Sequence, residues 1–148
     1  MSRIAILHVE DDSNDVLLLK HACEYAGVSL NVQTVEDGDE AISYLGGKGK
    51  FADRKRFPFP SLVLLDLRMP KMTGFEFLDW VRAQGNFRKL PVVVLSCSRC
   101  ELDIERAYVL GANSFLIKPI AFADLVELVK MLCYYWFNLN LLPLPRAA

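Results

Sequence analysis

The sequence lacks long apolar runs, an excess of charge of either sign, and an obvious targeting segment. None of its apolar stretches reaches the roughly 18 residues that a bilayer-spanning helix needs, and Glu10 and Asp11 come too early for a secretory signal. We therefore expect a cytoplasmic protein outside the membrane. The 17 basic and 18 acidic residues leave a net charge of -1, which does not favour a nucleic-acid partner. A local basic cluster is interpreted as a solvated loop: Lys48, Lys50, Arg54, Lys55 and Arg56.

Cysteine and histidine are also scarce. The four cysteines are expected to be reduced and to serve mostly as small core residues: Cys23, Cys97, Cys100 and Cys133. The C-S-R-C spacing of Cys97 and Cys100 is compatible with a redox pair, but a zinc site would need further ligands that no second pair or nearby histidine supplies. His8 and His21 are interpreted as structural residues.

The 148 residues suit one domain, and their periodicity predicts its fold. Short β-branched or leucine-rich runs predict strands at 4–9, 30–35, 62–66, 91–96 and 114–117. Helical periodicity fills the gaps at 14–26, 39–45, 74–84, 101–110 and 121–137. Strands one, three and four are almost continuously apolar, as in parallel sheets covered on both faces. We expect an α/β fold, a doubly wound five-stranded parallel sheet, (βα)5, in the flavodoxin-like order 2-1-3-4-5.

Several helix ends are marked in the sequence. Asp12 is expected to cap the first helix, and Thr73 with Glu76 forms a capping-box signature at the start of the third. Four helices are expected to stop at glycines able to adopt a left-handed backbone: Gly27, Gly46, Gly85 and Gly111.

Reactive side chains are expected at one edge of the sheet, because the carboxyl ends of parallel strands meet there. They are Glu10 and Asp11 after the first strand, Asp66 at the end of the third, Ser96 at the end of the fourth and Lys118 after the fifth. Clustered carboxylates are unfavourable without a cation, and oxygen ligands suit Mg²⁺. Beside the ion, a carboxylate can attack phosphorus while Lys118 neutralises the phosphoryl oxygens and Ser96 donates to one. A single acid at a strand end is more commonly a helix cap, the interpretation kept for Asp12.

The strings VEDD at 9–12, LLDLRMPKMTG at 64–74, VVLS at 93–96 and KP at 118–119 resemble the marker motifs of two-component response regulator receiver domains. The resemblance covers roughly residues 3 to 136 in order and spacing. It implies that Asp66 accepts a phosphoryl group from a sensor histidine kinase. It also implies that Asp11, Asp66 and the Arg68 backbone carbonyl ligate Mg²⁺, with Glu10 acting through water.

The same resemblance implies roles around the phosphoryl group. Lys118 would pair with it, Ser96 would move toward it on activation, and Phe115 would switch its rotamer. The bond between Lys118 and Pro119 would be cis. Ser96 is more often threonine in this family, Phe115 is often tyrosine, and Cys97 stands where a smaller residue is usual, which leaves the lifetime of the phosphorylated state open.

The long loop before the third strand and the apolar carboxyl-terminal segment further resemble single-domain regulators that partner bacterial phytochromes. The receiver domain is expected at 1–137, followed by an apolar tail at 138–148. With no output domain expected after the fifth helix, the protein would signal through protein-protein interaction rather than as an enzyme. It would catalyse at most its own phosphotransfer and dephosphorylation.

Two other classes of function stay open. A receiver-like scaffold could bind a partner without taking up phosphate. A flavodoxin-like electron carrier is less favoured, because a flavin phosphate needs a loop of backbone N–H donors where this chain has Glu-Asp-Asp. A D-x-D phosphatase would need a second acid where Arg68 stands.

The fifth helix predicts self-association. One apolar stripe suffices to cover the sheet: Leu125, Leu128, Val129, Leu132 and Trp136. A second apolar set lies largely off that stripe: Phe122, Val126, Cys133 and Phe137, followed by Leu139, Leu141, Leu142 and Leu144. Because soluble monomers seldom expose such a patch, we expect a homodimer through the fifth helix and tail. The alternative is a tail that folds back over its own helix.

Overall fold

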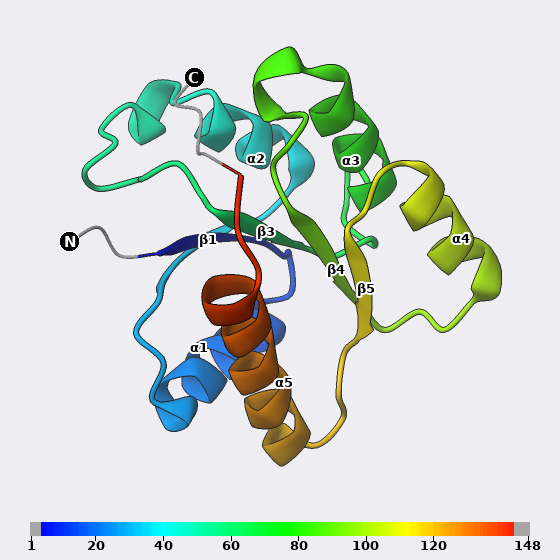
Figure 1. The fold of residues 1–148 in the computed structure, drawn as a ribbon. Helices are drawn as coiled ribbons and strands as arrows, with labels where there is room; N and C mark the ends of the chain where they lie inside the picture. The colour runs from blue at the N-terminus through cyan, green and yellow to red at the C-terminus, as the bar shows by residue number, and fades with distance from the viewer. Residues whose placement is uncertain (1–3, 144–148) are drawn as a thin grey trace.

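A parallel sheet between two helical layers forms the framework of the protein in a computed structural model that describes residues 4–143 (Figure 1). The strands are β1 Ala5–Val9, β2 Asn31–Val35, β3 Leu62–Leu65, β4 Val92–Ser96 and β5 Ser114–Ile117. The helices are α1 Ser13–Ala26, α2 Gly38–Leu45, α3 Gly74–Ala83, α4 Glu101–Val109 and α5 Phe122–Tyr134. All neighbouring strands are parallel in the order β2-β1-β3-β4-β5, so the predicted topology is confirmed.

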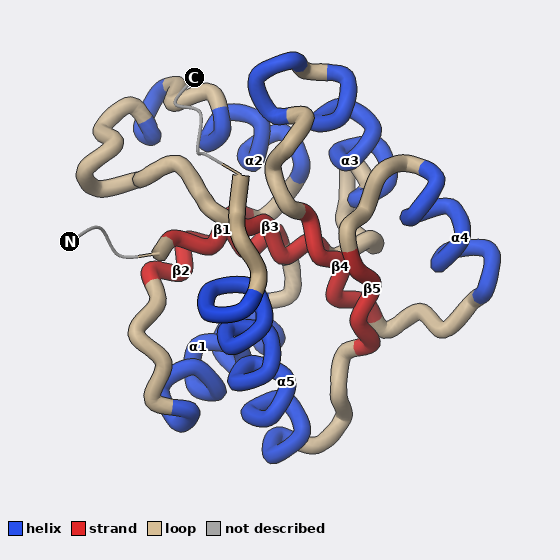
Figure 2. The backbone as a smooth tube through the Cα atoms, in the orientation of Figure 1, coloured by secondary structure: helices blue, strands red, loops and turns tan. Residues whose placement is uncertain are grey.

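Helices cover the two faces of the sheet unequally, with α1 and α5 on one side and α2, α3 and α4 on the other (Figure 2). Successive side chains of β1 point to opposite faces of the sheet and so contribute to both hydrophobic cores. Leu7 and Val9 join the core beneath α2 and α3, whereas Ile6 joins the core beneath α1 and α5. The central strands β3 and β4 are fully buried, because each is covered from both sides. This double cover explains their continuous apolar sequences.

The helix ends follow the predicted signals only in part. Asp12 caps α1 by accepting bonds from the backbone N–H of Asn14 and Asp15, and the Thr73–Glu76 capping box is complete. Gly27 and Gly111 adopt positive φ values of 71° and 105° after α1 and α4, as expected. The helices α2 and α3 also stop before the other two glycines, but the left-handed backbone predicted for these glycines is wrong. Gly46 is right-handed, with the left-handed residue one place later at Gly47, and Gly85 begins a 3-10 turn, Gly85–Phe87.

The segment between α2 and β3 is held by Arg54, which was expected to be part of a solvated basic loop. Its guanidinium donates hydrogen bonds to the carbonyl oxygens of Tyr44, Leu45 and Phe57 at 2.7 to 3.2 Å. Carbonyls at a helix carboxyl end lack partners within the helix, so this arginine caps α2. The solvated interpretation is therefore wrong for Arg54. It holds for the exposed residues of the cluster, Lys48, Lys50, Lys55 and Arg56.

Helix α5 packs against both the sheet and α1. Val126 and Cys133, predicted to lie on an uncovered stripe, are buried in the α1–α5 core, and Phe137 packs against the same core. That part of the prediction is wrong, because a helix that packs against both the sheet and α1 needs a wider apolar face than one that covers the sheet alone. Phe122 is exposed and meets the ring of Tyr25. Neither α5 nor another helix within residues 4–143 is long and apolar enough to cross a membrane.

Candidate functional site

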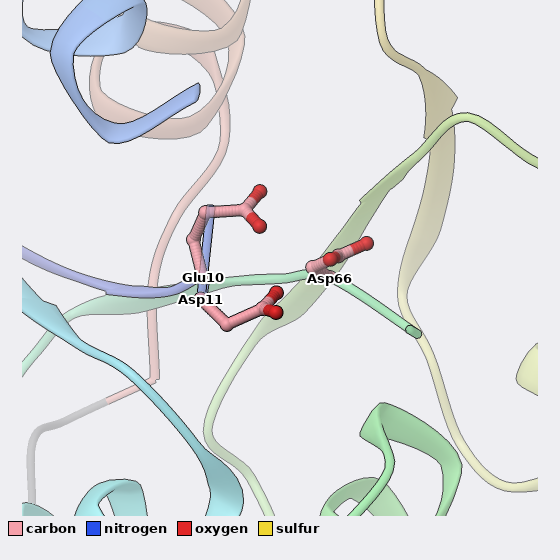
Figure 3. A group of neighbouring side chains, drawn as sticks. All are labelled: Glu10, Asp11 and Asp66. Carbon is pink, nitrogen blue, oxygen red and sulfur yellow. The ribbon is translucent and has the colours of Figure 1, made fainter. Parts of the chain in front are cut away.

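Two adjacent strand ends bring three carboxylates together (Figure 3). The Asp66 backbone N–H donates to the Val9 carbonyl at 3.1 Å, which fixes the end of β3 beside the end of β1. Glu10 and Asp11 follow Val9 directly. Ligand oxygens of Glu10, Asp11 and Asp66 all lie within 4.8 Å of one another. The prediction that these acids meet at the carboxyl edge of the sheet is therefore confirmed.

Lys118 supplies the positive charge at this cluster. Its backbone N–H donates to the Ser96 carbonyl at 2.8 Å, which continues the pairing of β5 with β4 and aims the side chain across the strand ends. The ammonium Nζ lies 2.7 Å from Glu10 Oε1, 2.8 Å from Asp15 Oδ2 and 3.7 Å from Asp66 Oδ1. Lys118 thus forms hydrogen bonds with two acids and faces Asp66 without one.

Burial makes the carboxylates hard to ionise without additional positive charge. It raises the pKa of Glu10 to about 7, against the opposing effect of Lys118, and it raises the pKa of Asp66. Burial alone would lower the pKa of Lys118, but its hydrogen bonds to Asp15 and Glu10 and the charge of Asp66 raise it above its ordinary value. One lysine among these carboxylates leaves an excess of negative charge.

The three acids suit a divalent cation. Their oxygens are hard ligands, and two of the side chains, Glu10 and Asp66, are almost fully buried at 1 % and 7 % exposure, which is unfavourable for unpaired anions. Asp11 is exposed and leaves one side of the group open to solvent. No cysteine or histidine joins this group within the described residues, so its chemistry matches Mg²⁺ or Mn²⁺ rather than a thiol-bound zinc.

The remaining predicted residues surround the acids at different depths. Ser96 is buried, and its hydroxyl accepts a bond from the Ser98 N–H at 3.1 Å. Ser96, Cys97 and Arg68 line the same open pocket as Asp66. The Arg68 side chain is 76 % exposed and pairs with Asp103 at 3.2 Å.

Two expectations on β5 and its following loop have different outcomes. Phe115 is half-buried and packs against the core beneath α2 and α3, outside the acidic pocket. The Lys118–Pro119 peptide bond was expected to be cis, and the structure corrects this, because no cis bond occurs within residues 4–143. The trans form is the ordinary state of a bond preceding proline, favoured by about 0.5–1 kcal/mol.

Gly74 allows the start of α3 to pack directly against the backbone of Asp66 and Leu67. The Gly74 N–H donates to the Leu67 carbonyl at 3.0 Å, and a Cβ at this glycine would clash with the Asp66 carbonyl oxygen. Any other residue would push α3 away from the end of β3. The glycine therefore fixes the backbone that carries Asp66.

Sequence reasoning missed one residue of the site and placed two cysteines wrongly. Asp15 was not singled out, although acids in a first helical turn point back toward the helix start, where this site lies. His8 is buried as expected, but its Nδ1 has no hydrogen-bond partner among residues 4–143. Cys97 and Cys100 are exposed free thiols rather than core residues, while Cys133 is buried as predicted.

Replacing His8 with leucine should make the protein less sensitive to acid. Burial, with a smaller contribution from Lys118, lowers the pKa of His8 to about 4 from its ordinary 6.5, although Asp15 opposes the shift. Between pH 4 and pH 6.5, therefore, the His8 side chain is protonated in the unfolded chain but stays neutral in the folded protein. The stability due to neutral His8 is thus complete above pH 6.5 and is lost as the pH falls toward 4.

Urea unfolding at pH 7 and pH 4.5 measures this effect. The loss of stability between the two should be about 2 kcal/mol smaller in His8→Leu than in the wild type. The exposed His21, replaced by glutamine, is the matched control and should behave as the wild type. Equal acid sensitivity of His8→Leu and wild type would contradict the prediction.

Comparison with known proteins agrees with this geometry. The family model described as "Response regulator receiver domain" matches residues 6–130. A curated relative, the response regulator Rcp1 of Synechocystis, is 31 % identical over 138 residues, covering 93 % of this chain and 92 % of its own length. A solved structure of Rcp1 in a Mn²⁺-bound form superposes with a TM-score of 0.82 at 30 % identity, covering 95 % of this chain and 99 % of that chain.

Two further solved structures are similar over nearly the whole chain. A response regulator of R. palustris, RPA3017, described in red light signalling, gives a TM-score of 0.91 at 36 % identity, covering 95 % of this chain and 99 % of that one. The phosphorylated cyanobacterial phytochrome response regulator RcpA gives 0.86 at 36 % identity, covering 97 % and 100 %.

Proposed function

Because the chain belongs to the response regulator receiver domain family, we propose that it accepts one phosphoryl group on Asp66 and signals through the resulting change of its surface. The observation that carries the proposal is the position of Asp66. Its buried carboxylate lies at the carboxyl end of the central strand β3, close to two further acids and to Lys118. The relative RcpA is described in a phosphorylated form, which supports the same chemistry here.

The transfer requires a nucleophile, a neutralised phosphoryl group and a leaving group. An Asp66 oxygen attacks phosphorus and forms a new P–O bond, while the bond from phosphorus to the donor nitrogen or oxygen breaks and its electrons leave with the donor. Lys118 lies close enough to pair with the transferred oxygens, and Ser96 lines the same pocket. Catalysis by the protein extends at most to this transfer and to hydrolysis of its product.

Mg²⁺ is the cation we propose for the acids. Asp11 and Asp66 would bind it directly with the Arg68 carbonyl, and Glu10 would act through water. When bound, the ion neutralises charge on the phosphoryl oxygens. The description of Rcp1 in a Mn²⁺-bound form supports the binding of a divalent cation. Mg²⁺ has the same preference for oxygen ligands in an open site that keeps waters.

The proposed phosphodonor is a sensor histidine kinase, with a phytochrome-type kinase favoured by the descriptions of RPA3017 and RcpA. The output is proposed to run through Ser96 and Phe115, which lie on neighbouring strands β4 and β5. Movement of Ser96 toward the phosphoryl group would leave space for the Phe115 ring to turn inward. A cytoplasmic location and the lack of a nucleic-acid partner stay predictions.

Treatment with acetyl phosphate and Mg²⁺ tests the proposed function. Intact-protein mass spectrometry should detect the mass of one phosphoryl group, lost again on incubation at neutral pH, because acyl phosphates hydrolyse. Omission of Mg²⁺ or addition of excess EDTA should prevent the gain. A chain that gains no mass under these conditions would instead act as a scaffold that binds a partner without phosphate.

We further propose that the receiver domain, residues 1–137, dimerises through α5 and the tail that begins at residue 138. The surface differs from the stripe expected from the sequence. An apolar groove between β5 and α5 is lined by Leu116, Leu128 and Met131, and Met131 is 70 % exposed. The Leu141 side chain of the tail is also exposed and therefore does not fill the groove. Leu144 lies outside the described residues.

Sedimentation at several concentrations should give twice the 16.8 kDa monomer mass, with and without acetyl phosphate. Met131→Glu places a charge in the proposed interface and should raise the dissociation constant about tenfold or more. Leu17→Glu is the matched control, since Leu17 is an exposed leucine of α1 outside the groove. A chain that stays monomeric throughout, and is unchanged by deleting residues 138–148, would exclude the dimer.

A further inference from the structure

We propose that Asp15 is a positioning residue that holds the Lys118 ammonium away from Asp66 until a phosphoryl group arrives. The inference rests on the proposed function and adds a residue to it. Asp15 is not among the acids that meet the metal-site spacing, and it does not touch Asp66 within hydrogen-bond reach. Its role would be to set how tightly the lysine is bound before transfer.

Lys118 has two acids as hydrogen-bond partners and a third acid, Asp66, farther away. Hydrogen bonds of 2.7 and 2.8 Å to Glu10 and Asp15 use two of its three ammonium protons. Asp66, at 3.7 Å, is beyond hydrogen-bond distance. A phosphoryl group on Asp66 extends from that carboxylate and brings new oxygens toward the same ammonium. The third ammonium proton is available to one of these oxygens, but Nζ lies 3.7 Å from Asp66 Oδ1, so close pairing with the phosphoryl group requires Lys118 to move and to loosen its contact with one of the two acids.

Of the two acids, Asp15 is the one whose bond can be released. Glu10 is 1 % exposed and also accepts the Asp12 N–H at 3.3 Å, so its carboxylate is held from two sides. Asp15 is about one third exposed, and Lys118 is its one described side-chain partner among residues 4–143. When Lys118 turns to the phosphoryl group, water can replace it at Asp15 at small cost. The same is not true of buried Glu10.

An ordinary structural role for Asp15 makes a different prediction. It lies in the first turn of α1, where an acid interacts favourably with the helix amino terminus. That role would change helix stability and leave the chemistry of the site unaltered. The bond to Lys118 crosses 103 residues of sequence and joins α1 to the loop after β5, which a helix-end acid does not require.

Removing the charge of Asp15 should move two properties of the site in opposite directions. In Asp15→Asn the pocket loses one negative charge and Lys118 is freed toward Asp66, so Mg²⁺ should bind about fivefold more weakly. The same change favours the incoming phosphoryl dianion and lets Lys118 meet its oxygens. At saturating Mg²⁺, phosphorylation by acetyl phosphate should therefore be about fivefold faster. A loss of structure would slow phosphorylation rather than accelerate it.

The experiment compares wild type, Asp15→Asn and Glu24→Gln. Glu24→Gln is the matched control, because Glu24 is an exposed acid of the same helix far from the site, and it should equal the wild type in both measurements. Mg²⁺ binding is measured by calorimetry and phosphorylation by intact mass over time. Circular dichroism melting confirms that each variant is folded.

The outcomes separate the inference from the proposed function. Weaker Mg²⁺ binding with faster phosphorylation in Asp15→Asn supports the positioning role. Phosphorylation of wild type and Asp15→Asn at equal rates, or slower transfer in the folded variant, overturns that role and leaves the proposed function intact. A wild type that takes up no phosphate overturns the proposed function and the inference together.

Discussion

Asp66→Asn is expected to take up no phosphate from acetyl phosphate and Mg²⁺, a reduction of about a hundredfold or more, because the amide cannot act as the nucleophile. The fold should survive, since asparagine has nearly the same shape. Stability without metal should be equal or higher, because burial raises the pKa of Asp66 and the neutral side chain avoids that cost. Intact mass and urea unfolding measure the two effects.

Asp39→Asn provides the control for loss of one acid, because Asp39 is exposed on α2 and outside the acidic pocket. It should be phosphorylated as fully as the wild type. Full modification of Asp66→Asn would place the phosphoryl group on another residue and disprove the assignment.

The neighbouring acids Asp11 and Asp12 should differ sharply when each is replaced by alanine. Asp11→Ala is expected to abolish Mg²⁺ binding and phosphorylation together, since it removes a direct carboxylate ligand from the group that includes Asp66. Asp12→Ala should retain both activities and lose about 1 kcal/mol of stability, because Asp12 caps α1 through bonds to Asn14 and Asp15.

Calorimetric titration with Mg²⁺, phosphate uptake and urea unfolding on the same preparations distinguish the two roles. Equal loss of activity in both variants would mean that the ligand and the cap have been assigned wrongly.

The sequence predicted the site because its residues follow strands whose ends are marked by composition. Runs such as LVLL favour central strands covered on both faces, and parallel strands end at the same edge of a sheet, so Glu10, Asp66 and Lys118 were expected to meet once the order of strands was known. The prediction needed no side-chain geometry. Its accuracy comes from topology alone.

The parts that failed depend on contacts between segments that no local pattern reports. The second stripe of α5 reads as an exposed surface until α1 is placed against it. Arg54 was predicted to be solvated because its hydrogen-bond partners are backbone carbonyls, and carbonyls occur at every residue and leave no signal in the sequence. Asp15 has no unusual neighbour in the sequence, and its partner Lys118 lies 103 residues away.

The ion pairs of Lys118 also tie the site to the order in which the chain is made. Its bonds to Glu10 and Asp15 close loops of 108 and 103 residues, and such long closures carry a large entropic cost until the intervening elements have folded. A nascent chain leaving the ribosome carries Glu10, Asp15 and Asp66 once β3 and the residue after it have emerged, but it lacks Lys118, which pairs with these acids, until β5 has been synthesised and docked. Competence for phosphotransfer is therefore acquired only after β5 and Lys118 have been synthesised, and chains truncated before β5 carry Asp66 without Lys118.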